Sequence, residues 1–263
     1  IHAGLTDPTF IRRATTGFAA FAASVEPYTL EYAERVTGVP AEVIRNAARA
    51  YARADRAIIC WTLGITEHHN AVDNVLSLIN LALLTGHVGK FGSGVNPLRG
   101  QNNVQGGGDM GAIPNRLAGF QDWTTDPEVR AKFERAWGVK LKPAYGSTVT
   151  QMFDAMEHGT FHALYAIGEN PAQAEADAGR AERLLQGLDH LVVQDIFLTR
   201  TGELAHVVLP ASASWCESEG TVTNSERRVQ RVRKALEPPG DARDDQWILS
   251  EIARRLGHDW GHP

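Results

Sequence analysis

Cysteine is scarce in this chain, and its scarcity excludes several classes of protein. Only Cys60 and Cys216 occur among 263 residues, with no CxxC pair and no Cys/His spacing of the zinc-finger kind. A scaffold held together by disulfides and a cysteine-based zinc module are therefore excluded. The pattern predicts two reduced cysteines in a reducing, cytoplasmic environment, with Cys60 in the core as part of the apolar run 57–61.

Long apolar runs and an excess of positive charge are also missing. No run approaches the roughly 18 apolar residues that a membrane span needs, and the formal net charge is -5. The sequence therefore predicts no membrane span in this segment and no nucleic acid as a partner. One local run of basic residues could be a solvated face or a groove for a ligand phosphate. It comprises Arg227, Arg228, Arg231, Arg233 and Lys234.

What remains is an alternation of helical and extended segments. Apolar residues at helical spacing predict helices that begin near residues 40, 71 and 148, and a last helix capped by Asp244 or Asp245. Runs typical of strands occupy 57–61, 163–167, 191–194 and 207–209, and a further helix is expected at 174–186. Because strand, turn, helix and strand follow at the spacing of a βαβ unit, we expect an α/β fold with Rossmann-like, mostly parallel sheets flanked by helices.

The segment 86–119 is a different kind of sequence. It holds ten glycines and two prolines with few large apolar residues, so we expect an ordered, functional loop rather than packed helices. A phosphate-binding P-loop is excluded, since Leu84 stands where that motif needs glycine and Phe91 where it needs serine or threonine. No G-x-G-x-x-G lies directly between a strand and a helix, which excludes a nicotinamide fingerprint.

Within this segment an arginine is followed by several side-chain amides. They are Arg99, Gln101, Asn102, Asn103 and Gln105. A guanidinium can bind a carboxylate through two parallel hydrogen bonds, and amides can donate and accept toward a polar heterocycle or a phosphate. The set suits a small carboxylate held beside a large polar cofactor. The alternative is an ordinary loop in which Arg99 braces backbone carbonyls.

Residues 95–110 (VNPLRGQNNVQGGGDM) closely resemble the signature loop of formate dehydrogenase alpha subunits, which are molybdenum or tungsten bis-pterin oxidoreductases. Other motifs of that family recur in the same order along nearly the whole chain. They are LGITE at 63–67, GHVGK at 86–90, GENP at 168–171, QDIF at 194–197, LPA at 209–211, WCESEGT at 215–221 and DQW at 245–247. Several ordered motifs are more specific than any single one.

The resemblance implies roles for particular residues. It implies that Arg99 orients formate, that Gln101 is a ligand of the pterin, and that Leu63 and Glu67 line one guanine-dinucleotide arm. Around the other arm it places Asn170, Ala174, Gln194, Ala211 and Asp245. Chemistry adds Gly168, in a tight turn after a strand, and Asp195, whose carboxylate, like that of Asp245, can accept hydrogen bonds from guanine. Contacts at the two alanines would run through the backbone.

The resemblance also implies a division of the chain. Residues 1–101 would be the end of one α/β domain that binds molybdopterin guanine dinucleotide, plus the active-site loop. Residues 102–213 would belong to a second such domain, and residues 214–263 would pack toward a cluster-binding domain.

The family pattern includes features that this chain does not show. Its members carry a four-cysteine motif for a [4Fe-4S] cluster and a cysteine or selenocysteine, followed by histidine, that ligates the metal. The resemblance implies that both lie before Ile1, with a further pterin-binding domain beyond Pro263, so no metal ligand is assigned here. The 263 residues alone are then expected not to oxidise formate.

The function expected is that of part of the catalytic subunit of a formate dehydrogenase, an oxidoreductase that converts formate to carbon dioxide. Two electrons would pass through the pterin and the cluster to an unidentified acceptor. The cofactors implied are molybdenum or tungsten bis-molybdopterin guanine dinucleotide and the [4Fe-4S] cluster. The alternatives are another enzyme of this class, such as a nitrate reductase, and a non-catalytic scaffold or electron-transfer subunit that retains the fold. An arginine clamp for a carboxylate speaks against the scaffold.

Overall fold

The computed structural model describes residues 1–224, 226 and 228–261. The chain forms two compact units, Ile1–Gly100 and a second that begins at Gln101. Within the described residues the elements form two parallel sheets, one antiparallel hairpin and surrounding helices. The mostly parallel α/β fold expected from the sequence is therefore confirmed. No described helix is long and apolar enough to cross a membrane.

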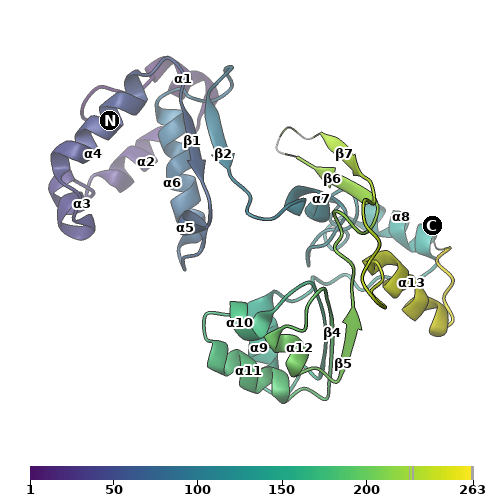
Figure 1. The fold of residues 1–263 in the computed structure, drawn as a ribbon. Helices are drawn as coiled ribbons and strands as arrows, with labels where there is room; N and C mark the ends of the chain where they lie inside the picture. Colours follow the sequence, from purple (N-terminus) through teal and green to yellow (C-terminus); the bar gives the residue numbers. More distant parts are fainter. Residues whose placement is uncertain (225, 227, 262–263) are drawn as a thin grey trace. The chain divides into compact units, whose positions relative to one another are not determined.

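The first unit places helices around a two-stranded parallel sheet (Figure 1). Its elements are α1 (Pro8–Ala14), α2 (Phe18–Val25), α3 (Leu30–Thr37), α4 (Ala41–Arg53), β1 (Ile58–Trp61), α5 (Leu63–Thr66), α6 (Ala71–Leu84) and β2 (Gly94–Pro97). The apolar stripe predicted after Asn70 becomes α6, which contacts β2. Hydrogen bonds from Gly94 N to Ala57 O (3.1 Å) and from Ala57 N to Ser93 Oγ (3.2 Å) fix where the two strands begin to pair.

The prediction for Cys60 was wrong. The residue lies in β1 but is exposed, as is Ile58, whose exposed fraction is 53%. Side chains alternate between the two faces of a strand, and in β1 the residues Ile59 and Trp61 take the partly covered face. An apolar run predicts the strand, but it does not show that both of its faces are covered.

The second unit contains a three-stranded parallel sheet in the order β3-β4-β5. Its elements are α7 (Val104–Asp109), α8 (Pro127–Trp137), α9 (Val149–Glu157), β3 (Ala163–Ile167), α10 (Pro171–Ala174), α11 (Ala178–Gln186), β4 (His190–Asp195), α12 (Arg200–Glu203), β5 (Val207–Pro210), β6 (Gly220–Thr223), β7 (Val229–Val232) and α13 (Asp245–Arg255). The single helix expected at 174–186 is divided into α10 and α11, because Glu175 is extended and Asp177 starts a new helix by capping Arg180 N.

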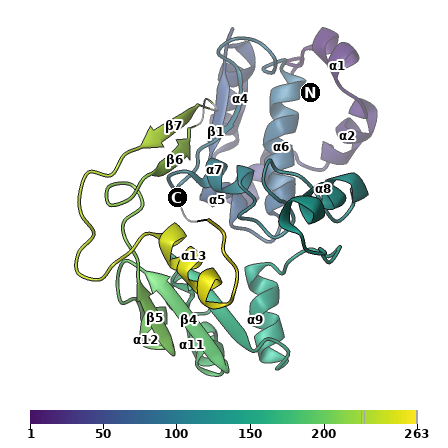
Figure 2. The same cartoon turned by 90° about the vertical axis from the view of Figure 1, so that its right-hand side faces the viewer.

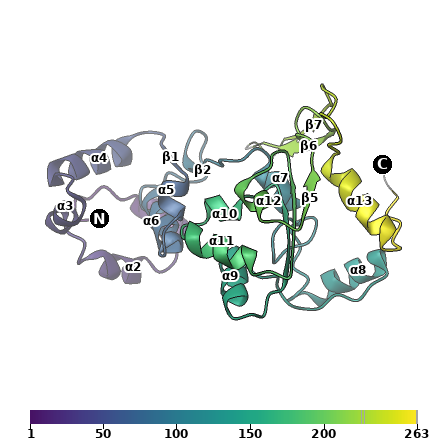
Figure 3. The ribbon, with the colours of Figure 1, turned by 60° about the horizontal axis from the view of Figure 1, so that its bottom comes forward.

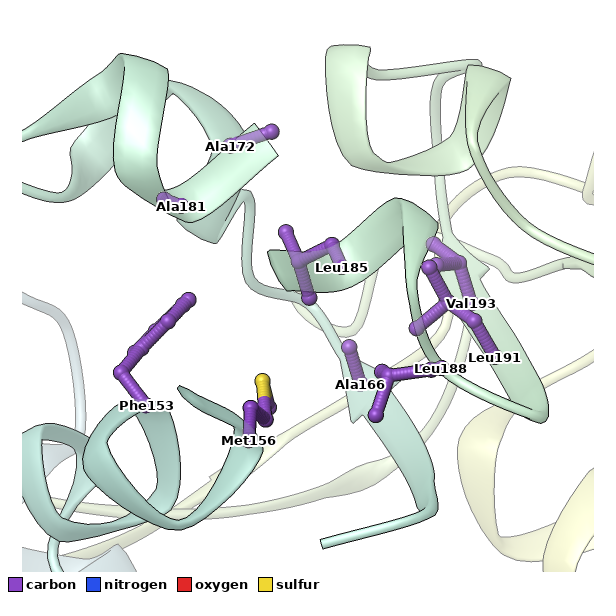
Figure 4. Packing of buried hydrophobic residues seen from close by; sticks show 9 residues of the cluster. All are labelled: Phe153, Met156, Ala166, Ala172, Ala181, Leu185, Leu188, Leu191 and Val193. Carbon is purple, nitrogen blue, oxygen red and sulfur yellow. The ribbon is translucent and has the colours of Figure 1, made fainter. Parts of the chain in front are cut away.

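The hydrophobic core of this unit lies on one face of the sheet. Leu191 and Val193 of β4 are fully buried in it, and Phe153 and Met156 of α9 and Leu185 of α11 belong to the same cluster (Figure 4). The helix α13 lies on the other side of β4 and β5 from α11 and α12 (Figure 2). The sheet therefore carries one apolar face toward α9–α12 and a second face, more polar, toward α13.

Asp122 organises the chain that follows the glycine-rich segment. Its Oδ1 accepts hydrogen bonds from Thr124 Oγ1 (2.7 Å) and from the backbone N–H groups of Thr124 and Thr125, and its Oδ2 from Arg116 Nη1 (3.1 Å) and Tyr145 Oη (3.0 Å). The bond from the Thr124 hydroxyl, with the backbone and Tyr145 donors, holds the pKa of this carboxyl well below its usual range.

This lowered pKa makes the stability contributed by Asp122 depend on pH. The contribution is complete above the ordinary carboxyl pKa near 3.8 and is lost as pH falls below it toward the folded-state pKa. We therefore expect Asp122→Asn to lower the urea midpoint at pH 7 and to lower it less at pH 3. Asp241→Asn, at an exposed carboxylate, is the matched control. Equal effects of Asp122→Asn at both pH values would contradict this assignment.

Candidate functional site

In the first unit, the predicted residues follow the carboxyl ends of two paired strands. The strands β1 and β2 run parallel, with Trp61 beside Pro97, and Leu98 N donates to Trp61 O at 2.8 Å. Leu63 and Glu67 follow β1, at the start of the short helix α5 and just after its end, and Arg99 lies two residues after the end of β2. Because parallel strands end at the same edge of a sheet, the two motifs emerge side by side although 32 positions separate Glu67 from Arg99.

All three of these side chains are exposed. Among the described residues, Arg99 donates no hydrogen bond to a backbone carbonyl and forms no ion pair with a carboxylate. Within that part of the chain, its guanidinium does not brace the loop. An accessible guanidinium at the carboxyl edge of a parallel sheet has the chemistry of an anion clamp.

The segment 86–119 is more regular than predicted. It contains the strand β2 and the short helix α7, so the expectation of a loop without helices was wrong in part. The helix forms in spite of three consecutive glycines because its start is fixed by a long-range contact. Asn103, in the left-handed region at φ 64°, accepts a hydrogen bond from Thr223 N through its side-chain Oδ1 at 2.9 Å.

This contact attaches the start of α7 to the strand β6, and Figure 3 shows α7 beside the β6–β7 hairpin. Gly106 is buried under the Asn103 amide, where a Cβ atom would overlap Asn103 Oδ1. At Gly107 and Gly108 a Cβ atom would meet nothing within 4 Å, so the backbone there is open. Gln101, the predicted pterin ligand, is exposed just before this anchored turn.

In the second unit, the sheet β3-β4-β5 brings most of the predicted residues to one edge. Ile167 lies beside Gln194, which lies beside Leu209. Gly168 N donates to Gln194 O at 2.9 Å, and Ala211 N donates to Asp195 O at 3.0 Å. The residues after β3, at the end of β4 and after β5 therefore share the carboxyl edge, where α/β sheets bind nucleotides.

Gly168 and Asn170 shape the turn after β3 rather than offering free polar side chains. Gly168 has φ 64°, which L side chains rarely adopt. Asn170 Oδ1 accepts hydrogen bonds from Thr201 N (3.1 Å) and Thr201 Oγ1 (2.8 Å), and its Nδ2 donates to Gln173 (3.0 Å). The described contacts of Asn170 are thus within the protein, and they tie the turn to α12.

The two alanines lie in different surroundings. Ala174 ends α10 and is exposed, whereas Ala211 is buried and pairs as an isolated bridge with Arg243. Ser212 N donates to Arg243 O at 2.8 Å, which brings the segment before α13 to the edge of the sheet. This pairing explains how Asp245, far along the chain, reaches β4.

Gln194 is fully buried, and both the oxygen and the nitrogen of its side-chain amide form hydrogen bonds within the protein. Its Oε1 accepts a hydrogen bond from Tyr165 Oη, and its Nε2 donates to Asp245 Oδ1 at 2.5 Å. Asp245 is half-buried at the start of α13, where the helix dipole favours a negative charge. The residue that can present a polar atom to a ligand is therefore Asp245, with Gln194 behind it. Tyr165 was not predicted, although strand alternation places it on the same face as Gln194.

The basic run lies in and after the β6–β7 hairpin. Arg231 pairs with Glu219 and Lys234 with Glu237, both at 2.5 Å, and all four side chains have solvent access. These ion pairs favour the solvated face over a phosphate groove for the two basic residues. Arg227 lies outside the described residues. No group of three metal-ligating side chains is found within the described part of the chain.

Comparisons with known proteins give the chain its family. Residues 33–255 match the family model for molybdopterin oxidoreductase. The chain is 47% identical over 259 residues to the F420-dependent formate dehydrogenase subunit alpha of Methanocaldococcus jannaschii, covering 98% of this chain and 38% of that protein. It is 45% identical over 259 residues to formate dehydrogenase H of Escherichia coli, covering 98% of this chain and 36% of that protein.

The fold is shared with a solved structure. Acetylene hydratase from Pelobacter acetylenicus superposes with a TM-score of 0.69 at 22% identity, covering 97% of this chain and 38% of the other. The chain spans between a third and two fifths of the length of the relatives named here. The extent of the family match and the shared fold agree with the motifs read from the sequence. The chain belongs to the molybdopterin oxidoreductase family.

Proposed function

We propose that this chain is the part of a formate dehydrogenase catalytic subunit that orients formate and holds a bis-molybdopterin guanine dinucleotide cofactor. The observation that carries the proposal is the position of Arg99. It is exposed and unpaired within the described residues, at the carboxyl edge of a parallel sheet, in a chain 45–47% identical to formate dehydrogenase subunits. A guanidinium that can bind a carboxylate at this position supports the proposal that the substrate is an acid.

The role proposed for Arg99 is orientation. A guanidinium can donate two parallel hydrogen bonds to the two oxygens of formate, neutralising its charge and leaving the C–H bond as the group that faces away from the arginine. Formate has a single carbon, so this pair of hydrogen bonds fixes the direction of the bond to be broken. No other group of the substrate is available to do so.

The residues present fit the implied cofactor. Gly107 and Gly108 leave open space over the backbone, the turn at Gly168 is equally open, and Asp245 offers a carboxylate at the edge of a parallel sheet. We assign Leu63 and Glu67 to one nucleotide arm, Gly168, Asn170, Ala174, Gln194, Asp195, Ala211 and Asp245 to the other, and Gln101 to the pterin. When bound, a molybdenum or tungsten bis-pterin supplies two-electron redox chemistry.

The [4Fe-4S] cluster, the electron acceptor and a cytoplasmic location remain part of the proposal for the whole protein. Neither cysteine of this chain belongs to a four-cysteine motif, so no cluster ligand is assigned to it. The three domains expected at 1–101, 102–213 and 214–263 also stay a prediction. The contacts within the chain divide it between Gly100 and Gln101.

The test uses the full-length protein that carries this chain. Elemental analysis is expected to find molybdenum or tungsten together with iron, and formate is expected to reduce an artificial electron acceptor such as a viologen dye. Nitrate, offered with reduced dye, should not be turned over. Metal with nitrate turnover would assign the protein to the alternative enzyme class, and absence of the metal would favour a scaffold subunit.

A further inference from the structure

Three hydrogen-bonded side chains lie along the polar face of the β3-β4-β5 sheet. Strand alternation puts Tyr165 and Gln194 on the face opposite the hydrophobic core, as diagonal neighbours on adjacent strands. The hydroxyl of Tyr165 donates to Gln194 Oε1, and Gln194 Nε2 donates to Asp245 Oδ1. This series of hydrogen bonds runs from the interior of the sheet to the half-buried start of α13.

The direction of these hydrogen bonds decides which way the Gln194 amide points. A carboxylate is only an acceptor, so it requires the NH₂ end of the amide, and a hydroxyl that donates holds the oxygen end. Burial, and secondarily the charge of Asp245, raise the pKa of Tyr165. Its hydroxyl therefore keeps its proton and its role as donor at neutral pH.

This arrangement leaves one carboxylate oxygen for a ligand. Oδ1 of Asp245 takes the amide N–H, and among the residues that the structure describes no donor reaches Oδ2. Guanine presents a ring N–H and an exocyclic amino group on one edge, and both can donate to a carboxylate. Adenine presents a ring nitrogen lone pair beside its amino group, which a carboxylate repels.

We propose that Tyr165 is a positioning residue that, through Gln194, orients the Asp245 carboxylate and thereby sets the preference of this edge for guanine over adenine nucleotides. The inference rests on the nucleotide site of the proposed function and deepens it. Without the Tyr165 hydroxyl, no side chain holds the Oε1 end of the Gln194 amide. The amide then loses its fixed position, the Nε2–Oδ1 hydrogen bond no longer orients the Asp245 carboxylate, and the edge loses its selectivity.

The test measures binding of GMP, IMP and AMP to the purified 263-residue chain by calorimetry. The wild-type chain should bind GMP more tightly than AMP, with IMP between them because it lacks the amino group. Tyr165→Phe keeps the ring and removes one hydroxyl. It should reduce the ratio of AMP to GMP dissociation constants by roughly three- to tenfold, the effect of one hydrogen bond.

Two further variants distinguish the positioning role of Tyr165 from the nucleotide site on which that role depends. Asp245→Asn should abolish the guanine preference. Tyr145→Phe removes a hydroxyl that hydrogen-bonds Asp122 instead, and it should leave the ratio unchanged. If Asp245→Asn removes a preference that Tyr165→Phe retains, the positioning role is wrong while the nucleotide site stands. If the wild-type chain shows no preference for GMP, the nucleotide site fails and the inference fails with it.

A second readout needs no ligand. In the wild-type chain the side-chain amide protons of Gln194 should exchange slowly with solvent in NMR spectra, because the group is fully buried and bonded to Asp245. Tyr165→Phe should speed this exchange without unfolding the sheet, whose backbone amides stay protected. Unchanged exchange of the Gln194 amide would overturn the positioning role.

Discussion

Replacing Arg99 by lysine in the full-length enzyme should lower kcat/KM for formate by about ten- to a hundredfold. An ammonium keeps the positive charge but loses the planar pair of N–H donors that matches a carboxylate. Hydrogen bonds to charged groups contribute about 1.5–3 kcal/mol each, and each 1.4 kcal/mol corresponds to a factor of ten. We expect KM to rise because binding weakens, and kcat to fall because the C–H bond is less well aligned.

The control is the same exchange at an exposed arginine elsewhere in the first unit. Arg49 lies on α4, and Arg49→Lys should leave both constants within twofold of wild type. Metal and cofactor content must be measured for each variant, since a loss of cofactor would lower kcat alone. If Arg99→Lys retains wild-type kcat and KM at full cofactor occupancy, Arg99 does not clamp the substrate.

Replacing Gly111 by alanine should lower the free energy of unfolding of the second unit by roughly 2–4 kcal/mol. Gly111 has φ 90°, in the region that L side chains rarely adopt. A Cβ atom there would lie 2.9 Å from Ala118 N and from Leu117 C. Because both are backbone atoms, no side-chain rotation can relieve the overlap, and the chain that crosses at Leu117–Ala118 has to move.

The matched control lies four residues earlier. Gly107 is inside α7, and a Cβ atom there would meet nothing within 4 Å. Gly107→Ala is therefore expected to be neutral or stabilising by up to about 1 kcal/mol, because alanine favours helix. Urea unfolding followed by tryptophan fluorescence suits the comparison, since Trp61 is the only tryptophan outside the second unit. Equal effects of the two substitutions would contradict the close packing at Gly111.

Local sequence signals predicted the framework of the candidate site. Apolar runs and turn residues located β1, β3, β4 and β5, and the tight turn expected after the strand at 163–167 is the one that contains Gly168. Capping chemistry located the start of α13, where Asp244 accepts from Trp247 N at 2.8 Å. These features depend on residues close together in the chain, and their periodicity is visible in one sequence.

Contacts between distant residues were not predictable in the same way. Gln194 and Asp245 are 51 positions apart, and Asn103 and Thr223 are 120 apart. Nothing in the spacing of a buried glutamine shows whether its amide faces a ligand or another side chain. The helix α7 was missed for a related reason. Its glycines have low helix propensity, and the anchor that stabilises its start comes from the β6–β7 hairpin.

The hydrogen bond between Thr223 N and Asn103 Oδ1 requires a particular side chain at position 103 but only a backbone N–H at position 223. The acceptor is a side-chain oxygen, so position 103 tolerates only residues that carry one at the same reach and accept the left-handed backbone. The donor is a backbone N–H, so every residue except proline supplies it at position 223. Homologous chains that keep this contact should therefore vary freely at 223 and hardly at all at 103, and a search for co-varying pairs would not detect it.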